Sequence, residues 1–395
     1  MNLISLSAFL NKYATSPADN QNLNEFLADA KLITSKGKEI VLNDYINEHL
    51  KNNENFNKKE FLQGISLLLE NIKKRMDYLT RFYNTSLKVD KNNRHIVDVD
   101  AMEKNKLDNN TSVQYKNLIR NLHYQHILKK TESGFENTPT FLTIIDQLFN
   151  KNKIDYKLLT PSAIFYMKQG RLGSVFSSYY FRASILNPYL IYSLNENVLK
   201  GKHIFTPTLG WSSYLMGFFE SPMVKTYVGT DVIPSVVKKT EALAESYRGI
   251  HNENERTYDF YTEPSENLCK NKKFLNKYTG FFDTVFFSPP YFKLELYKSV
   301  NQSTMMYPDY ETWLLEYWEN TVKLCHKVLQ KGGKMCYILS GYGSHEKKSF
   351  IDLVNDMNSI TKRYFTQKEI LQMHNKNVHS TKHRETGEKI MIFVK

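Results

Sequence analysis

The chain has 395 residues, of which 41% are hydrophobic, and it carries a formal net charge of +12. This length exceeds that of one ordinary domain, and the isoelectric point near 9.2 favours a polyanionic partner over a solvated basic surface. Three scattered cysteines exclude a disulfide scaffold and lack the paired spacing of a zinc site, and no stretch reaches the length of a membrane span. We therefore expect a soluble, intracellular protein with reduced cysteines and no metal site. Its expected location is the cytoplasm, or the nucleus or a viral factory if the source is a eukaryote or a virus of one.

The first part of the chain has helical rather than strand periodicity. Apolar residues recur at three- and four-residue steps over residues 60–83, with lysines and arginines between them, which predicts an amphipathic helix with basic edges. A polar, aperiodic stretch over 88–112 predicts a long loop, and a second helical pattern covers 113–130. His123 and His126 in that pattern have no acidic or cysteine partner, so packed or surface histidines are favoured over metal ligands. These features predict a mainly helical accessory domain over residues 1–164 that helps to bind nucleic acid.

Short apolar segments alternate with helical patterns from about residue 165, as in parallel βαβ units. This alternation predicts a three-layer α/β domain over residues 165–395. The expected helices cover 212–219, 234–247 and 309–330, the last capped by Asp309 and ended by Gly332-Gly333. The expected strands lie near 202–206, 225–230, 257–261, 281–287, 334–339 and 389–394, with another near 361–365.

Polar and turn residues follow the first three predicted strands, at the end where α/β sheets bind ligands. Gly210 in "TPTLGWSS" lets the backbone approach a ligand just before a helix N-terminus. Asp231 follows the second strand, where its carboxylate can accept both hydroxyls of a ribose or can cap the helix that starts near Pro234. After the third strand come Ser265 and Glu266, which can meet an adenine edge.

The fourth strand stops abruptly at Ser288-Pro289-Pro290-Tyr291, because the two prolines fix φ and lack backbone donors. With this ending, the chain resembles the S-adenosylmethionine-dependent amino-methyltransferases of DNA. The catalytic motif of that family is Asp, Asn or Ser, then Pro-Pro, then Tyr, Phe or Trp, at the end of the fourth strand. The resemblance covers roughly residues 165–395 and implies a Rossmann-like methyltransferase sheet.

The resemblance also implies the cofactor, the reaction and the roles of the site residues. Ser288 Oγ and the Pro289 carbonyl would accept the hydrogens of an exocyclic amine, while Pro290 holds that carbonyl rigidly. Tyr291 would stack on a base that has been swung out of the duplex. The residues implied in binding S-adenosylmethionine are Phe181, Arg182, Thr206, Pro207, Thr208, Gly210, Asp231, Val232, Ser265, Glu266 and Ser288.

The substrate expected from this resemblance is DNA. Serine in the first motif position is commoner among the cytosine-N4 enzymes, so site-specific methylation of cytosine N4 is the first expectation. Two other substrates stay open as alternatives, adenine N6 in DNA and an amine in RNA. A third alternative is an inactive nucleic-acid-binding scaffold, because the first motif contains only one glycine. No pattern in the sequence indicates the oligomeric state.

A long connection, "FKLELYKSVNQSTMMYPDY", follows the motif and leads to Asp309. It is longer than most strand-to-helix connections and has little apolar periodicity, which is more typical of a functional loop than of a connector. We predict that Lys293 and Lys298 contact phosphates and that Tyr297 or Tyr307 stacks on bases.

Overall fold

The computed structural model describes residues 3–52, 56–84, 97–251, 256–341, 351–374 and 385–395. The chain divides into two compact units. The sheet unit comprises Val89–His123 and Ile185–Lys395, and the N-terminal unit comprises Asn2–Lys88 and Tyr124–Ser184. The division into units places residues 165–184 in the N-terminal unit, whereas the sequence predicted a domain boundary between residues 164 and 165. The predicted domain boundary itself stays a prediction. Part of the predicted loop over 88–112, residues 88–96, lies outside the described residues.

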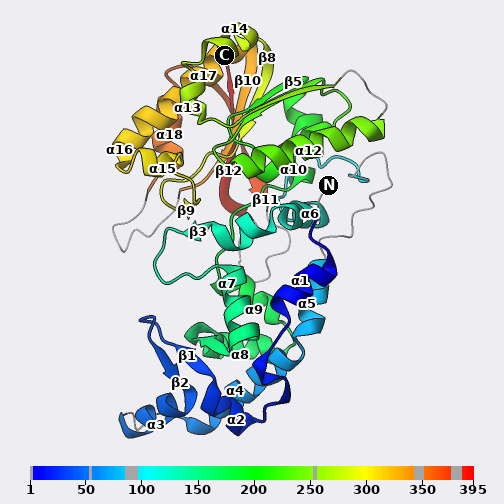
Figure 1. Ribbon diagram of the computed structural model, residues 1–395. Helices are drawn as coiled ribbons and strands as arrows, with labels where there is room; N and C mark the ends of the chain where they lie inside the picture. Colours follow the sequence, from blue (N-terminus) through cyan, green and yellow to red (C-terminus); the bar gives the residue numbers. More distant parts are fainter. Residues whose placement is uncertain (1–2, 53–55, 85–96, 252–255, 342–350, 375–384) are drawn as a thin grey trace. The chain divides into compact units, whose positions relative to one another are not determined.

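A seven-stranded mixed sheet forms the centre of the sheet unit (Figure 1). Its strands are β5 His203–Thr206, β6 Thr226–Thr230, β7 Thr257–Tyr261, β8 Phe282–Phe287, β10 Leu329–Leu339, β11 Thr366–His374 and β12 Glu385–Val394. Their order is β11-β12-β10-β8-β5-β6-β7. The strands from β10 to β7 pair in parallel, whereas β12 is antiparallel to both of its neighbours. The carboxyl ends of the five parallel strands therefore meet at one edge of the sheet.

The two central strands are buried on both faces, which explains why they read as continuous apolar runs. Ile204 and Phe205 of β5 are fully buried, as are Val285, Phe286 and Phe287 of β8. A parallel strand covered by helices on both sides has this composition rather than an alternating one. As predicted, β8 ends immediately before Ser288.

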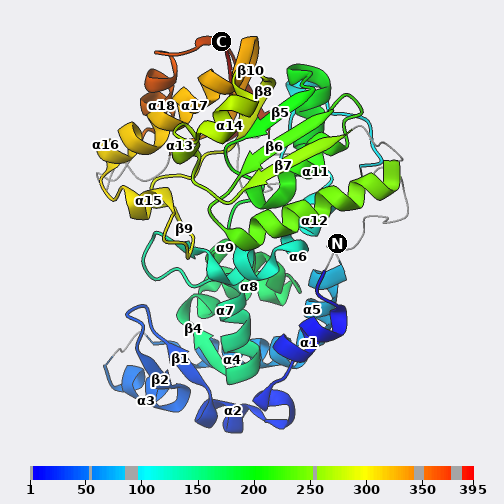
Figure 2. The same cartoon turned by 45° about the horizontal axis from the view of Figure 1, so that its top comes forward.

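Helices cover both faces of the sheet (Figures 1 and 2). One face carries α6 Gln114–Leu122, α10 Pro188–Leu194, α11 Ser213–Phe219 and α12 Pro234–His251. The other face carries α13 Ser265–Leu268, α14 Lys272–Tyr278, η9 Trp313–Glu319, α17 Asn320–Val328 and α18 Leu353–Thr361. This arrangement confirms the expected three-layer α/β architecture. None of the described helices has the length and apolar character needed to cross a membrane.

Two predicted boundaries in the sheet unit were wrong. The helical stretch that Asp309 caps runs through α16 Tyr310–Thr312 and η9 but ends at Val328, so Gly332-Gly333 lies inside β10 instead of ending the helix. Gly332 has a φ of +77°, and the pairing of β10 with β8 shifts register between Leu329 and Lys334. The strand expected near 361–365 begins at Thr366, because α18 extends to Thr361.

The N-terminal unit is mainly helical, as predicted. Its α-helices, among the described residues, are α1 Leu6–Tyr13, α2 Leu23–Asp29, α3 Leu42–Asn52, α4 Lys58–Lys73, α5 Arg75–Asn84, α7 Phe141–Ile145, α8 Pro161–Lys168 and α9 Leu172–Tyr179. The single helix predicted over 60–83 is divided between α4 and α5 at Lys74. The unit also contains a three-stranded sheet that the sequence did not suggest, formed by β1 Lys31–Ile33, β2 Glu39–Val41 and β4 Lys153–Asp155.

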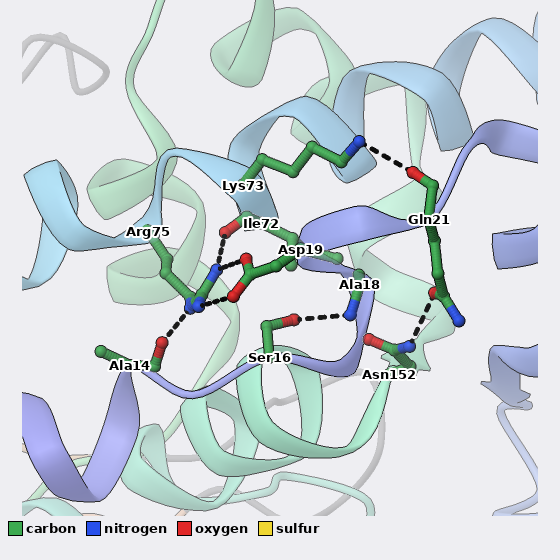
Figure 3. A network of polar contacts seen from close by, with 9 residues as sticks. All are labelled: Ala14, Ser16, Ala18, Asp19, Gln21, Ile72, Lys73, Arg75 and Asn152. Atoms are coloured by element: carbon green, nitrogen blue, oxygen red, sulfur yellow. Dashed lines mark hydrogen bonds and ion pairs between the residues drawn. The ribbon is translucent and has the colours of Figure 1, made fainter.

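A buried arginine joins several segments of the N-terminal unit (Figure 3). The Arg75 guanidinium forms two hydrogen bonds of 2.5 and 2.7 Å with the carboxylate oxygens of Asp19. It also donates to the carbonyl oxygens of Ala14 and Ile72. Because the Arg75 side chain is almost fully buried, these acceptors provide the hydrogen bonds that a buried charge requires. The hydrogen bond from Arg75 lowers the pKa of Asp19.

Candidate active site

The Ser-Pro-Pro-Tyr turn lies at the carboxyl edge of the sheet, where hydrogen bonds connect it to α11 and to the end of β10. The Ser288 N–H donates to the Tyr214 hydroxyl at 3.0 Å, and the Ser288 hydroxyl lies 3.1 Å from the carbonyl oxygen of Ile338 in β10. A carbonyl only accepts hydrogen bonds, so the hydroxyl proton of Ser288 is directed toward Ile338. The lone pairs of Ser288 Oγ are therefore the part of this group that can face a substrate.

The last residue of the motif is fixed through its hydroxyl. The Tyr291 hydroxyl accepts the N–H of Ser340 at 2.8 Å and lies 3.1 Å from Ser340 Oγ. Ser340 directly follows β10, so the hydrogen bonds attach Tyr291 to the strand beside β8. Burial raises the pKa of Tyr291, so the phenol stays protonated at neutral pH. The ring is thus held in place by its polar end.

The turn after β5 has an unusual backbone. Gly210, Trp211 and Ser212 have consecutive φ values of +50°, +58° and +67°. Each residue other than glycine in this left-handed region costs about 1–3 kcal/mol, so the surroundings must stabilise the turn. Part of the space is filled by the Tyr214 ring, which a Cβ on Gly210 would approach within 2.2 Å. Tyr214 thus contacts this turn with its ring and Ser288 with its hydroxyl.

Asp231 connects the turns after β5 and β6. Its Oδ2 accepts the N–H of Leu209 at 3.2 Å, and its Oδ1 accepts the N–H of Ile233 at 3.0 Å. The second bond is the local capping interaction that the sequence left open as an alternative. A carboxylate can accept about four hydrogen bonds, so capacity remains for a ligand. Burial raises the pKa of Asp231 to about 6, against backbone hydrogen bonds that lower it.

Ser265 and Glu266 begin α13 at the end of β7, as predicted. Both are buried, and the Ser265 hydroxyl lies 2.9 Å from that of Thr321. Burial raises the pKa of Glu266 to about 7. The nearby Tyr317 hydroxyl is also buried and has no hydrogen-bond partner among the described residues. Because buried polar groups generally have a hydrogen-bond partner, this hydroxyl is a candidate contact for a ligand.

The segment after the motif is folded against the turns that follow β5 and β6. The Tyr297 ring meets Trp211 edge-on, with 5.8 Å between the ring centroids, and its hydroxyl donates to Glu295. Farther along, the Ser299 hydroxyl donates to the Val232 carbonyl at 3.4 Å. Short hydrogen-bonded stretches, β9 Glu295–Leu296 and α15 Ser303–Met306, interrupt what was expected to be a loop.

The predicted nucleic-acid contacts in this segment differ in exposure. Lys293 and Lys298 are exposed, and the Lys293 ammonium lies 5.0 Å from the centre of the Phe292 ring. Tyr297 and Tyr307 are half-buried. Burial and the charge of Glu266 raise the pKa of Tyr307, which places Tyr307 near α13. The two lysines are thus the members of this set that solvent reaches most easily.

The other residues implied in cofactor binding at this edge are the last residue of β5 and the first residues of the turn that follows it. Thr206 is fully buried, with its hydroxyl 2.8 Å from that of Tyr227. The next two residues, Pro207 and Thr208, are buried and half-buried. They precede the strained turn, so the whole segment lies at the carboxyl end of β5.

Phe181 and Arg182 belong to the N-terminal unit. The backbone N–H of Phe181 donates to Pro139, and its carbonyl accepts the N–H of Phe141. Both contacts lie within that unit. Their part in cofactor binding stays a prediction.

Several residues of the site were missed by sequence reasoning. Tyr214 lies in α11 and Ser340 follows β10, and neither belongs to a motif. Glu388 precedes Lys389, which pairs with Leu339, so it too lies near the carboxyl end of β10. An aromatic residue four positions after a turn glycine was the one available signal for Tyr214. The others depend on strand register, which the sequence alone did not provide.

No family model matches the sequence. No match was found among curated proteins either. Solved structures with a similar fold include the N-methyltransferase NodS from Bradyrhizobium japonicum WM9 in complex with S-adenosyl-l-homocysteine, with 11% identity over 52% of this chain and 82% of that chain (TM-score 0.33). TrmN from Thermus thermophilus is 12% identical over 53% of this chain and 49% of that chain (TM-score 0.32).

A SAM-dependent methyltransferase from Methanosarcina mazei is 12% identical over 49% of this chain and 92% of that chain, with a TM-score of 0.32. At TM-scores this low, the similarities do not bear on cofactor, substrate or mechanism. These must be inferred from the residues of the site.

Proposed function

We propose that the protein is an S-adenosylmethionine-dependent methyltransferase that modifies an exocyclic amine of a base in DNA, with cytosine N4 as the first candidate. The observation that carries this proposal is the hydrogen bond from Ser288 to Ile338, which leaves the serine as an acceptor in the Ser-Pro-Pro-Tyr turn. Asp231 and the turn containing Gly210 lie at the same edge of the sheet. A site for a nucleoside cofactor would therefore adjoin a site for an amine.

The acceptor role follows from the chemistry of the amine. Its lone pair is delocalised into the ring of the base, so the nitrogen must pyramidalise before it can attack a methyl group. Ser288 Oγ and the Pro289 carbonyl each accept one amine hydrogen and favour that geometry. A serine hydroxyl that directed its own proton at the amine would oppose this pyramidal geometry. The Ile338 carbonyl prevents that orientation, because it accepts the Ser288 proton.

Tyr291 supplies the stacking surface in this proposal. Its hydroxyl is fixed to Ser340, so the ring loses little conformational freedom when a base binds. Base–aromatic stacking contributes about 1–3 kcal/mol and tolerates any base. A base must leave the duplex to reach this ring, and we therefore include base flipping in the proposal.

The residues around α13 fit an adenosyl group. Glu266 can accept from an exocyclic amine, and the Tyr317 hydroxyl offers a further polar atom that lacks a partner among the described residues. Asp231 has free acceptor capacity for ribose hydroxyls. Bound S-adenosylmethionine would supply an electrophilic methyl group on its sulfonium. The protein contributes alignment, and it needs no strong acid or base.

The ionisation of Asp231 gives a test of cofactor binding. We expect the Kd for S-adenosylhomocysteine, measured by calorimetry, to rise as the pH falls below about 6, by up to tenfold per pH unit, because protonation removes the charged acceptor. Asp231→Asn should bind weakly at pH 7 and lose the part of the pH dependence that is centred near pH 6, so that only the part contributed by ionisation of Glu266 near pH 7 is left. The raised pKa also means that ionisation of Asp231 lowers the free energy of unfolding between about pH 4 and pH 6. A wild-type Kd that is constant from pH 5 to pH 7 would return Asp231 to a capping role.

The exposed lysines give a test of DNA binding. Replacing Lys293 and Lys298 together by alanine should weaken DNA binding and reduce the salt dependence of the association constant by up to about two phosphate contacts. Affinity for S-adenosylhomocysteine without DNA should not change. Fluorescence anisotropy with a labelled duplex at several salt concentrations measures the slope. The matched control replaces Lys202 and Lys225, two exposed lysines that precede β5 and β6 at the opposite edge of the sheet. Superimposable titrations of the 293/298 variant and the wild type would contradict the assignment.

One incubation tests substrate class and modified atom together. The protein is mixed with isotopically labelled S-adenosylmethionine and separate DNA and RNA pools, which are then digested to nucleosides for mass spectrometry. We expect label in N4-methyl-2′-deoxycytidine from DNA. Label in N6-methyl-2′-deoxyadenosine, or in a nucleoside from RNA, would change the proposed substrate but not the proposed reaction at an exocyclic amine. If no pool is labelled and calorimetry detects no cofactor binding with DNA present, the scaffold interpretation is correct.

A further inference from the structure

A chain of three buried side chains lies behind the strained turn after β5. The His123 Nε2 atom is 2.9 Å from Ser212 Oγ, and Ser212 Oγ is 2.7 Å from Thr240 Oγ1. All three residues have no solvent exposure. They come from the end of α6, the turn and the middle of α12. Ser212 is one of the two non-glycine residues with positive φ in this turn.

The direction of each hydrogen bond follows from the far end of the chain. The Thr240 hydroxyl lies 2.8 Å from the carbonyl oxygen of Val236, which can only accept, so Thr240 donates there. Thr240 Oγ1 is then the acceptor for the Ser212 proton. Ser212 Oγ in turn accepts from His123, which must carry a proton on Nε2. The imidazole is therefore the donor that completes the chain.

The ring of His123 also restrains the neighbouring residue of the turn. Its centroid lies 6.0 Å from that of the Trp211 indole, which also contacts Tyr297. One imidazole thus contacts the side chains of both Trp211 and Ser212. This interaction gives a structural role to a histidine that was expected to be either packed or at the surface.

We propose that His123 is a positioning residue that holds the Gly210-Trp211-Ser212 turn in the conformation needed to bind the cofactor. The proposal rests on the function proposed above. His123 is fully buried, so it does not meet the substrate and acts through Ser212 and Trp211. Its removal should release the turn rather than change the chemical step.

The test uses two substitutions of His123 in the full chain. Glutamine places an amide donor near the position of Nε2, whereas phenylalanine keeps an aromatic ring and removes the donor. Amide hydrogen exchange of a peptide covering residues 209–213, measured without cofactor, should be at least about tenfold faster in His123→Phe and close to wild type in His123→Gln. Thr240→Val should also speed exchange, because Ser212 then loses the acceptor for its proton.

Cofactor binding provides the second measurement. The Kd for S-adenosylhomocysteine should rise about tenfold in His123→Phe and stay within about twofold in His123→Gln, with kcat at saturating S-adenosylmethionine little changed in both. Unchanged exchange in both His123→Phe and Thr240→Val would overturn the inference, and so would equal acceleration in the glutamine and phenylalanine variants. If the wild type binds no cofactor, the proposed function fails, whereas the exchange data still decide whether His123 holds the turn.

Discussion

Replacing Ser288 by alanine is expected to lower kcat by about a hundredfold or more while the Kd for S-adenosylhomocysteine stays within about twofold. The substitution removes an acceptor that is needed when the amine pyramidalises, and a preorganised hydrogen bond of this kind typically contributes a factor of 100–1,000 to kcat. Ser288 is half-buried and its backbone N–H still bonds to Tyr214, so the fold should not change. Single-turnover methylation with labelled cofactor measures the rate.

Two further variants test whether the loss of rate comes from the loss of Ser288 Oγ as a hydrogen-bond acceptor. Ser288→Asn retains a carbonyl oxygen and introduces a residue that the resembled family uses at this position, so it should recover part of the activity. Ser178→Ala, at an exposed serine of the N-terminal unit, should leave the rate unchanged. If Ser288→Ala methylates at nearly the wild-type rate, the Ser-Pro-Pro-Tyr turn is not the catalytic centre.

The sheet could be predicted because its strands are short apolar runs separated by helical patterns. Residues such as Val285 and Phe286 are fully buried, and burial on both faces leaves few other residue types acceptable. The two prolines after Ser288 fixed the end of β8 for a steric reason that needs no tertiary information. Local physics was sufficient in both cases.

Boundaries that depend on pairing could not be predicted in this way. Gly332-Gly333 has the composition of a helix stop, yet Leu329 already pairs with Phe282 of β8. The glycines accommodate the register shift instead, with Gly332 at positive φ. In the N-terminal unit, β1, β2 and β4 have only three residues each, too few to show alternation.

The candidate site was only partly visible in the sequence for a related reason. Strand ends identified Asp231, Ser265 and Ser288, because parallel strands bring their carboxyl ends together. The contacts that fix these residues join distant positions without a pattern. Tyr214 reaches Ser288 across 74 residues, and His123 reaches Ser212 across 89. Such partners become recognisable only when the helices have been placed on the sheet.

Gly210→Ala is expected to be the most disruptive single methyl addition in the site. The new Cβ would lie 2.2–2.7 Å from ring carbons of Tyr214, and the residue would have to keep a φ of +50°. Overpacking costs about 1–3 kcal/mol and the left-handed conformation about 1–2 kcal/mol, so the free energy of unfolding should fall by about 2–5 kcal/mol. Displacement of Tyr214 would also remove the acceptor of the Ser288 N–H. We therefore expect both cofactor binding and kcat to decrease.

Gly280→Ala separates these two contributions. Gly280 has a φ of +66°, but a Cβ there would meet no atom within 4 Å, so this control carries the backbone cost without the collision. It should unfold about 1–2 kcal/mol more easily and keep full activity. Tyr214→Phe tests the connection to Ser288, because it keeps the ring and removes the hydroxyl. Chemical denaturation gives the free energies, and calorimetry gives the Kd. The prediction would be contradicted if both variants lost the same amount of stability and both kept the wild-type affinity for the cofactor. Tyr214 would then move aside freely and would not link the turn after β5 to Ser288.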